Sequence, residues 1–446
     1  MNKRAETFPG AQEGSRRDFL KTSAAVPVAA LSVLVDGRGV FAAGSDIIRV
    51  GMIGCGGRST EAATQAMNAD KGARLVAMAD IVKDRIHEKR KALKEKYADQ
   101  VVVDDGHCFA GFDAYKRVIE SVDLVLIANA AKFHPLHMMA ALQAGKHVFV
   151  EKPHAIDPAG IKVVQAACEL AKRKKLCVLS GLQSRYWLAF QETIQRVHDG
   201  AIGDIVAIEE NFLRAPYVLY PRQPGLTEVE YQASNQYHFR WLSGDDVPQS
   251  LVHNLDRASW ALRGQVPARC HGMGGRSTLH GEIYGDVFDH HAVVYEFASG
   301  VQLYAFSRTI PDCFNKTSSV LLGTKGRAFV SVGRIEGEKA WTYSGPKMYS
   351  SLAVNPYQVE HNELFKAIRA GNPINSADYM ANSTLMGIMG QISCYTGKEV
   401  TWEQLTASDF YFAPKPEDVR ADMEPPVKQR GDGTYPVLIP GVTKLL

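Results

Sequence analysis

A glycine-rich segment contains the first residues whose types and spacing could support chemistry, Gly54-Cys55-Gly56-Gly57-Arg58-Ser59. It follows a nearly continuous apolar run, residues 47–53, and precedes a helix-like segment, residues 60–68. This order fits the pattern G-x-G-x-x-G with serine in the third position, in which a pyrophosphate approaches the free N–H groups of a helix N-terminus. The residues that we expect to bind a dinucleotide here are Gly54, Gly56, Gly57, Arg58 and Ser59.

An acidic residue closes the next apolar run. Residues 74–79 predict a second strand, and Asp80 follows it directly. A carboxylate at this point would bind the adenosine ribose hydroxyls and would repel a 2′-phosphate. We therefore expect NAD rather than NADP, although Arg58 could partly offset the repulsion. The alternative is a glycine turn in a Rossmann-like fold that binds nothing.

The elements that would position these residues alternate along the chain. Helices are predicted over residues 83–97, 115–120 and 134–144, and strands over residues 101–103, 123–128 and 147–150. Strands separated by helices in this rhythm predict a doubly wound parallel sheet. We therefore assign residues 46–180 to a Rossmann dinucleotide-binding domain of an α/β protein.

The composition favours a small-molecule ligand. The 446 residues are 46% hydrophobic and 22% charged, which is ordinary for globular protein and excludes a disordered or fibrous chain. A net charge of +3, spread along the sequence, indicates neither a nucleic acid nor an anionic membrane as partner. The seven cysteines form no C-x-x-C pair, so we interpret them as mostly buried apolar residues.

The N-terminal segment resembles a twin-arginine signal peptide. Arg16-Arg17 and Phe19-Leu20-Lys21 precede an uncharged stretch, residues 22–35, and then small residues at 42–44. The apolar stretch is too short to span a bilayer. We expect residues 1–45 to be the signal, and the mature chain to be periplasmic with no membrane span. An amphipathic or disordered leader is the alternative.

A longer pattern resembles the Gfo/Idh/MocA family, which is named after glucose-fructose oxidoreductase and inositol dehydrogenase. The dinucleotide turn is followed by Asn129 after an apolar run, by His134 eleven residues before Gly145, and by Glu151-Lys152-Pro153 after the next strand. The resemblance implies an NAD-dependent oxidoreductase, and it implies that Asn129, His134, Glu151 and Lys152 lie at the cofactor.

The resemblance also implies a second, α+β domain over residues 181–446, built on a large, mostly antiparallel sheet that covers the nicotinamide. The sequence agrees in outline, because residues 204–212, 287–297 and 301–309 read as strands and residues 251–262 have helical periodicity. We expect this domain to bind the substrate and to assemble a homo-oligomer.

Removal of a hydride from a carbinol carbon requires a group that takes the hydroxyl proton and groups that orient the substrate. The resemblance implies that Lys152 lies beside the reacting hydroxyl, where its ammonium would stabilise a developing alkoxide. His253 matches the family histidine that is usually assigned to proton transfer. The alternatives are a solvated loop lysine and a core histidine bonded to the backbone or to Asp256.

One position departs from the family pattern. Members that resemble inositol dehydrogenase have an aspartate four residues before the histidine, and this chain has Gln249 there. Glutamine can orient a ring but carries no charge. We therefore take Gln249 as the third catalytic candidate and expect His253 to titrate lower than in relatives with the aspartate. Asp245 or Asp246 could supply the missing carboxylate.

Arginine and aromatic residues in the second domain suggest a sugar site, since such sites pair planar polar groups with an aromatic platform. The candidate substrate residues are Arg185, Tyr186, Arg240 and Trp241. Four histidines, His271, His280, His290 and His291, could suggest a metal. Adjacent strand residues such as His290 and His291 point to opposite faces, so we expect no metal.

Three functions remain open from the sequence. The first is an NAD-dependent oxidoreductase that acts on a sugar or cyclitol hydroxyl and holds its cofactor tightly, because free NAD is scarce outside the cytoplasm. The second is a redox-neutral, NAD-dependent glycoside hydrolase. The third is a non-catalytic sugar-binding protein on a Rossmann scaffold.

Overall fold

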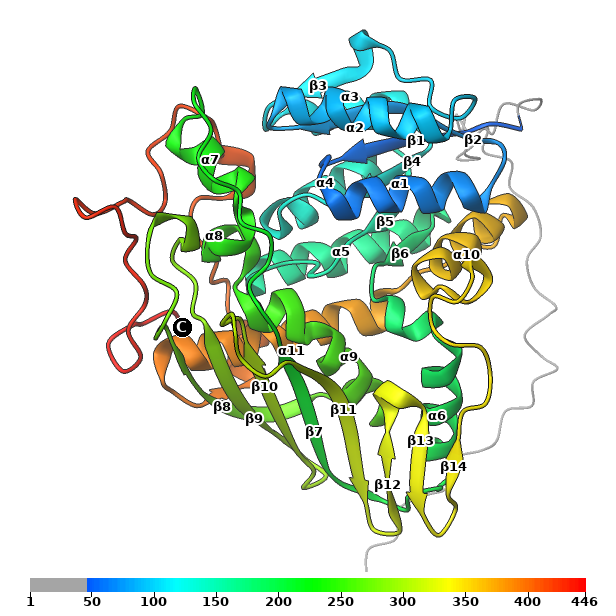
Figure 1. The fold of residues 1–446 in the computed structure, drawn as a ribbon, viewed down its shortest axis with the longest axis vertical. Coiled ribbons are helices and arrows are strands. Elements are labelled where there is room, and N and C mark those ends of the chain that lie inside the picture. Colours follow the sequence, from blue (N-terminus) through cyan, green and yellow to red (C-terminus); the bar gives the residue numbers. More distant parts are fainter. Residues whose placement is uncertain (1–45) are drawn as a thin grey trace, which may run out of the picture. The chain divides into compact units, whose positions relative to one another are not determined.

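The computed structural model describes residues 46–446. In this part of the chain, strands form two sheets, one of six and one of nine strands, with helices packed against both (Figure 1). The expected signal, residues 1–45, lies outside the described residues. Among residues 46–446, no helix combines the length and the apolar composition needed to cross a bilayer.

The first sheet is parallel and has the order β3-β2-β1-β4-β5-β6. Its strands are β1 (Ile48–Ile53), β2 (Ala73–Asp80), β3 (Cys108–Ala110), β4 (Leu124–Ile127), β5 (His147–Val150) and β6 (Val178–Ser180). Strand β4 is buried along its whole length, as is typical of a sheet that is covered by helices on both faces. The expected doubly wound sheet is confirmed.

The helices of this domain are α1 (Gly57–Ala69), α2 (Lys83–Lys96), α3 (Ala114–Ser121), α4 (His134–Gln143) and α5 (Pro158–Lys174). They agree with the predicted segments. One predicted strand, residues 101–103, is wrong, because Val101 makes only a single bridge to Leu75 and Val102 is 50% exposed. The third strand of the sheet is β3 instead.

The second sheet is mostly antiparallel and has the order β14-β13-β12-β11-β7-β10-β9-β8-β15. Its strands are β7 (Ile205–Leu213), β8 (Pro267–Gly275), β9 (His290–Phe297), β10 (Gln302–Arg308), β11 (Lys316–Gly323), β12 (Gly326–Phe329), β13 (Arg334–Gly337), β14 (Trp341–Thr342) and β15 (Val400–Thr401). Strands β7 and β10 are the parallel neighbours. Buried residues alternate with more exposed ones along β9, so one face of the sheet is covered. The predicted second domain is confirmed in architecture.

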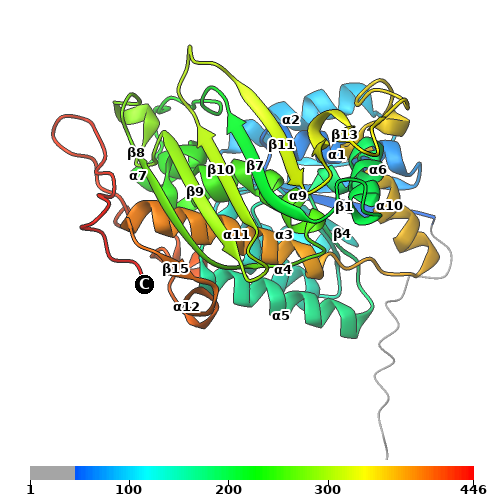
Figure 2. The same ribbon diagram turned by 90° about the horizontal axis from the view of Figure 1, so that it is seen from below.

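Two helices cover the buried face of the second sheet. These are α9 (Val252–Ala261) and α11 (Ala377–Thr396), and Figure 2 shows them behind the strands, on the side of the first domain. Helix α11 packs on β8 and β9 and also contacts α5 of the first domain. The remaining helices of this half are α6 (Leu188–His198), α7 (Glu228–Ser234), α8 (Arg240–Ser243) and α12 (Trp402–Ala407).

Helix α10 (Pro356–Ala370) belongs to the second half of the sequence but packs on α1 of the first domain (Figure 1). Its buried Leu364, Phe365 and Ile368 share an apolar cluster with Ile48 of β1. A cut of the chain at residue 180 would therefore leave this part of the Rossmann domain uncovered. The return of α10 also brings its first turn to the edge of the candidate site.

The irregular C-terminal tail, residues 408–446, packs back onto the molecule. Phe412, Val427 and Tyr435 are buried in one apolar cluster with Tyr231 and Phe239. The Tyr435 hydroxyl donates a hydrogen bond to the Glu228 carboxylate, 2.5 Å away. The tail therefore holds the segment that contains α7 and α8.

Candidate active site

Two adjoining cavities lie where the parallel strands end. The first, of about 350 Å³, lies at the carboxyl ends of β1 and β2, and the second, of about 380 Å³, lies beside the end of β5. Both are lined by Arg58, Asn129, Tyr217 and Tyr237, so they share a wall. Open α/β sheets bind ligands at this edge.

The turn between β1 and α1 fits a dinucleotide. Gly54 has φ +93°, and a Cβ there would lie 3.0 Å from the carbonyl oxygen of Ala128, so the turn requires glycine. A Cβ on Gly56 or Gly57 would meet nothing within 4 Å, so both face open space. Helix α1 has no side-chain cap among the described residues, and its first turn carries no acidic residue. An anion can therefore take the first N–H groups of α1. Ser59 is fully buried and lets α1 pack closely.

Asp80 lies at the end of β2 and lines the first cavity. Its carboxylate accepts hydrogen bonds from the backbone N–H groups of Cys55, at 2.7 Å, and Val82, at 2.9 Å. Asp80 thus joins the glycine turn to the next loop. Arg85, which the sequence analysis missed, lies 3.3 Å from Asp80 and lines the same cavity.

Asn129 and His134 have different roles. Asn129 lines both cavities, and among the described residues its buried Oδ1 has no hydrogen-bond partner, which leaves it available to a ligand. His134 lines neither cavity. Its ring lies between the carbonyl oxygens of Pro153, at 2.8 Å, and Asn129, at 3.0 Å. His134 therefore positions the loops after β4 and β5, which corrects its assignment as a cofactor contact.

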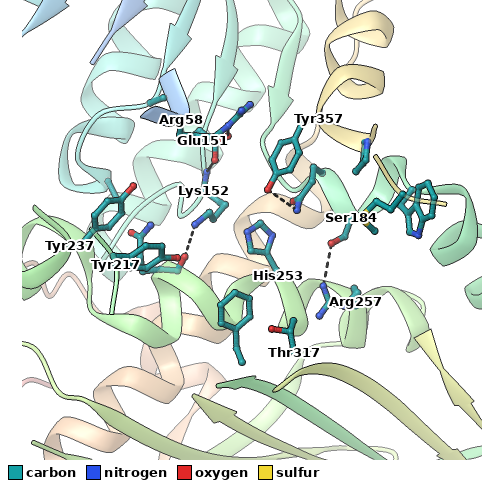
Figure 3. A pocket seen from close by; sticks show the side chains of 18 of the residues that line it. Arg58, Glu151, Lys152, Ser184, Tyr217, Tyr237, His253, Arg257, Thr317 and Tyr357 are labelled. Carbon is teal, nitrogen blue, oxygen red and sulfur yellow. Dashed lines mark hydrogen bonds and ion pairs between the residues drawn. The ribbon is translucent and has the colours of Figure 1, made fainter. Parts of the chain in front are cut away.

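Glu151 orients Arg58 at the junction of the two cavities. The Arg58 Nε donates to Glu151 Oε1 at 2.6 Å, and the guanidinium lies 4.7 Å above the ring of Tyr357, from α10 (Figure 3). The buried Glu360, also on α10, lies 3.8 Å from Arg58. Arg58 and Glu151 belong to local motifs and were predicted, whereas the packing of α10 on α1 leaves no local signal in the sequence.

Lys152 lines the second cavity from the end of β5. Its Nζ donates to the backbone carbonyl oxygen of Gln249 at 2.6 Å (Figure 3). Within residues 46–446, Lys152 has no carboxylate at ion-pair distance. Lys152 can therefore take the predicted position beside the reacting groups, and its hydrogen bond to Gln249 fixes the direction of its ammonium.

His253 lines the same cavity from the first turn of α9. Burial lowers its pKa well below the ordinary value, and the positive charges of Lys152 and Arg257 add to the effect. The ring is therefore neutral, as a proton acceptor must be. In the described part of the chain, its buried Nδ1 has no hydrogen-bond partner.

Gln249 also lines the cavity but does not hold the His253 ring through any hydrogen bond in the described structure. It lies in a single π-helical turn, Val247–Leu251, and contributes its backbone carbonyl to Lys152. Asp245 accepts hydrogen bonds from the Phe288 N–H and the Tyr395 hydroxyl. Neither Asp245 nor Asp246 lines the cavity of His253, so the missing carboxylate is not supplied by them.

The four predicted substrate residues line neither cavity, because each has internal partners. Arg185 pairs with Asp256 at 2.8 Å, and Arg240 pairs with Asp286. The Trp241 side chain is 2% exposed and donates to Gln232. Tyr186 packs against the apolar cluster that contains Ile48 and Phe365. The structure therefore does not bring these four residues to the wall of either cavity.

Other residues form the wall of the second cavity. The rings of Tyr217 and Tyr237 stack with centroids 4.4 Å apart, and Trp187 and Phe190 lie on another part of the wall. The polar wall residues that were not predicted from the sequence include Ser184, Arg257, Thr317 and Tyr357. Arg257 could have been found, because it follows His253 by one helical turn.

Metal ligands do not converge in the described residues, where no group of three His, Cys, Asp or Glu side chains could hold an ion. His290 is exposed and His291 buried on β9, as their opposite faces predict. Of the seven cysteines, five are buried, which agrees with their interpretation as apolar core residues.

Comparisons with known sequences agree with the dinucleotide site. Residues 48–181 match the family described as "Oxidoreductase family, NAD-binding Rossmann fold". An inositol 2-dehydrogenase of Acidothermus cellulolyticus is 28% identical over 49% of this chain and 54% of its own length. A myo-inositol 2-dehydrogenase of Thermotoga maritima is 27% identical over 63% of this chain and 75% of its own. A glycosyl hydrolase family 109 protein of Solibacter usitatus is 31% identical over 32% of this chain and 33% of its own. The chain thus spans about half the length of the first of these relatives.

Solved structures share the fold. An aldose-aldose oxidoreductase from Caulobacter crescentus, complexed with glycerol, is 20% identical with a TM-score of 0.60, over 80% of this chain and 99% of that one. A levoglucosan dehydrogenase in complex with NADH and levoglucosan is 17% identical with a TM-score of 0.60, over 79% and 99%. Together with the glycine turn, Asp80 and the Glu151-Lys152-Pro153 segment, the family match identifies residues 48–181 as a domain of the Gfo/Idh/MocA oxidoreductases with an NAD-binding Rossmann fold.

Proposed function

We propose that this protein oxidises a secondary hydroxyl of a sugar or cyclitol with NAD. The observation that carries the proposal is the position of Lys152 and His253 on the wall of one cavity, which shares Arg58 and Asn129 with the dinucleotide cavity. A substrate in the second cavity would meet a hydrogen-bonding cation, a neutral imidazole and the end of the dinucleotide site together. This set of groups is sufficient for alcohol dehydrogenation.

The chain would position and deprotonate the substrate. When bound, the nicotinamide supplies the hydride acceptor. Lys152, directed by the carbonyl oxygen of Gln249, would donate a hydrogen bond to the substrate oxygen and stabilise its developing negative charge. The neutral His253 ring would accept the hydroxyl proton. Tyr217 and Tyr237 would provide an apolar platform for the ring.

The cofactor part of the proposal is tested by mass spectrometry of the purified, denatured protein. We expect released NAD or NADH in about equal amount to the chain. Titration of cofactor-free protein should then give tighter binding of NAD than of NADP, because the Asp80 carboxylate would repel a 2′-phosphate. Tighter binding of NADP would contradict the proposed choice.

We further propose that the cofactor is tightly held. Tyr217, Val218 and Tyr220 precede α7 and line the dinucleotide cavity. The C-terminal tail packs against this same part of the molecule through Tyr435. Release of the dinucleotide would therefore require this segment to move.

A redox-neutral glycoside hydrolase is the second candidate, and the match to the glycosyl hydrolase family 109 protein favours it. Such an enzyme would release an alcohol from a glycoside and leave the amount of oxidised cofactor unchanged over the full reaction. Assays with nitrophenyl glycosides distinguish it, because release of nitrophenol without a ketone product would replace the dehydrogenase proposal.

Export through the twin-arginine pathway is also proposed, on the evidence of Arg16-Arg17 and the following apolar stretch. A folded protein exported in this way would take its cofactor along. Replacement of Arg16 and Arg17 by lysine should leave the chain in the cytoplasmic fraction of cells, and unchanged periplasmic recovery would contradict export by this route.

A homo-oligomer is proposed from the outer face of the second sheet. Met273, Tyr304 and Leu322 are exposed there, on β8, β10 and β11. A second subunit that packs on this face of the sheet would cover these three side chains. Light scattering at micromolar concentration should give a multiple of the mass of the chain, and a monomer would contradict this proposal.

A further inference from the structure

The second cavity carries positive charge that the described residues compensate only in part. Of its charged wall residues, Arg58 is paired with Glu151, whereas Lys152, within residues 46–446, donates from its side chain to a backbone carbonyl alone. Arg257 lies on the opposite side of His253 from Lys152 (Figure 3). The dinucleotide phosphates would bind at the glycine turn of α1, so they do not account for a cation at Arg257.

Arg257 is unusually poor in partners for a buried arginine. The residue is 5% exposed, and its Nη1 donates to the Ser184 hydroxyl at 3.2 Å. Among the described residues, its Nε and Nη2 have no hydrogen-bond acceptor. A buried guanidinium with unsatisfied donors is costly, which indicates that a ligand completes its hydrogen bonds.

The nearest carboxylate does not fill this role. Glu210 Oε2 lies 3.9 Å from Arg257 Nη2, beyond hydrogen-bond distance. The two Glu210 oxygens already accept hydrogen bonds from Asn254, at 2.7 Å, and Ser319, at 2.5 Å. Burial also raises the pKa of Glu210 to about 7, so near neutral pH it offsets the Arg257 charge only in part.

We infer that the substrate carries a carboxylate and that Arg257 binds it. A carboxylate matches the planar guanidinium fork with two parallel hydrogen bonds, and the Ser184 and Thr317 hydroxyls lie on the same wall. The substrate class is then an acidic sugar or cyclitol acid, such as a uronate. The carboxylate is unchanged in the reaction, in which the carbinol carbon gives its hydride to NAD and the hydroxyl gives its proton to His253.

The spacing along α9 supports one substrate that reaches both groups. His253 and Arg257 are four residues apart on one helix, so they lie on the same face at a distance of about 5–6 Å between Cβ atoms. A single sugar ring with a carboxylate substituent can span such a distance. This placement rests on the proposed oxidation at His253, but the binding of a carboxylate at Arg257 can be tested without turnover.

The test uses the full chain loaded with NAD and two matched pairs, D-glucuronate with D-glucose and D-galacturonate with D-galactose. We expect kcat/KM for at least one uronate to exceed that of its neutral partner by about a hundredfold, the scale of a buried charge pair. Arg257→Gln should reduce this ratio to near one, and Arg257→Lys should reduce it in part, because lysine cannot make the paired hydrogen bonds.

Arg276→Gln is the matched control. Arg276 is partly buried and donates to the carbonyl oxygens of Tyr284, Gly285 and Val287, but it lines neither cavity. This variant should keep the ratio of the native protein. If Arg257→Gln does not fold, the partial loss in Arg257→Lys still decides the outcome.

Three results would overturn the inference: a preference for the neutral sugar, a preference for D-glucose 6-phosphate over D-glucuronate, or an unchanged ratio in both Arg257 variants. Calorimetric titration of the NAD-loaded protein separates this inference from the proposed function. Binding of a uronate that is lost in Arg257→Gln, without reduction of NAD by any sugar, would support the carboxylate site and contradict the dehydrogenase. Turnover of neutral sugars without uronate binding would contradict the carboxylate site and support the dehydrogenase.

Discussion

Lys152 and His253 reach one cavity from distant parts of the chain, and their surroundings give them different tasks. The Gln249 carbonyl oxygen accepts a hydrogen bond from the Lys152 side chain and so fixes its direction. Burial and the neighbouring cations lower the pKa of His253 and keep its ring neutral. Both residues could be predicted from the sequence because they belong to local motifs. The other walls of the cavity could not, since Tyr217, Tyr237 and Tyr357 come from separate elements.

The first prediction concerns Lys152. Lys152→Ala should lower turnover by about a hundredfold or more, the usual scale for a charge-stabilising group, and should leave NAD binding almost unchanged. Turnover and the dissociation constant of NAD are the two measurements. Lys172→Ala, on the exposed side of α5, is the control, and native turnover in Lys152→Ala would exclude Lys152 from the mechanism.

The second prediction concerns the pH dependence of His253. An aspartate in place of Gln249 would face the same cavity and favour the charged imidazolium, so Gln249→Asp should move the acidic limb of the pH-rate profile to higher pH by about one unit. His253→Ala should abolish that limb and most of the activity. A limb that stays in place in Gln249→Asp and persists in His253→Ala would show that His253 is structural.

At the scale of elements, the local pattern of apolar residues predicted the strands and helices around the glycine turn. The same pattern gave a wrong prediction at residues 101–103, where tertiary contacts leave a single bridge to Leu75 instead of a strand. The π-helical turn before α9 is a second example. Within this turn the Gln249 carbonyl accepts a hydrogen bond from Lys152, whereas a sequence spacing of four residues suggested a side-chain contact with His253.

The four predicted substrate residues show the same limit. Arg185 and Arg240 have the right chemistry, but each pairs with a buried aspartate that lies far away in the sequence, Asp256 and Asp286. The neighbouring Ser184 and Trp187 line the cavity instead. The sequence pattern thus identified the segment around residues 184–187, but it did not show which of its side chains face the cavity.

The third prediction concerns strand β7. Burial raises the pKa of Glu210 to about 7 from 4.5, so the folded protein binds its proton more tightly than the unfolded chain does. Its contribution to stability is therefore full below about pH 4.5 and falls as the pH rises to about 7. Relative to Glu210→Gln, the free energy of unfolding of the native protein should fall by up to about 3 kcal/mol between pH 4.5 and pH 8.

Chemical denaturation at several pH values measures this difference. Glu209→Gln is the control, because Glu209 lies on the more exposed side of the same strand and pairs with Lys316 at 3.0 Å. A difference between native protein and Glu210→Gln that does not change with pH would contradict the assignment.

At the scale of the whole molecule, the second half of the chain completes a site that the Rossmann domain begins. Helix α10 supplies Tyr357 behind Arg58, and α9 supplies His253 and Arg257. The C-terminal tail packs on the segment that lines the dinucleotide cavity. The sequence offered no interpretation of this tail, because its contacts are made with residues about 200 positions away.

The fourth prediction is that the tail slows release of the cofactor. Tyr435 is 2% exposed and bonds to Glu228 of α7, so Tyr435→Ala removes a buried aromatic ring at a cost of about 3 kcal/mol to local packing. NAD should then dissociate at least about tenfold faster, as measured by its loss to an NAD-trapping enzyme. Tyr411→Ala, an exposed position in the same tail, should release NAD at the native rate. Equal rates in all three proteins would show that the tail does not retain the cofactor.

The central claim is that a sugar or cyclitol hydroxyl is oxidised by NAD in the cavity of Lys152 and His253. The most direct measurement is rapid mixing of NAD-loaded protein with a panel of sugars, uronates and cyclitols, while the absorbance of reduced nicotinamide is followed. We predict that at least one member gives one equivalent of reduced cofactor per chain together with a ketone product. No reduction with any member, or glycoside cleavage with no ketone product, would contradict the proposed function.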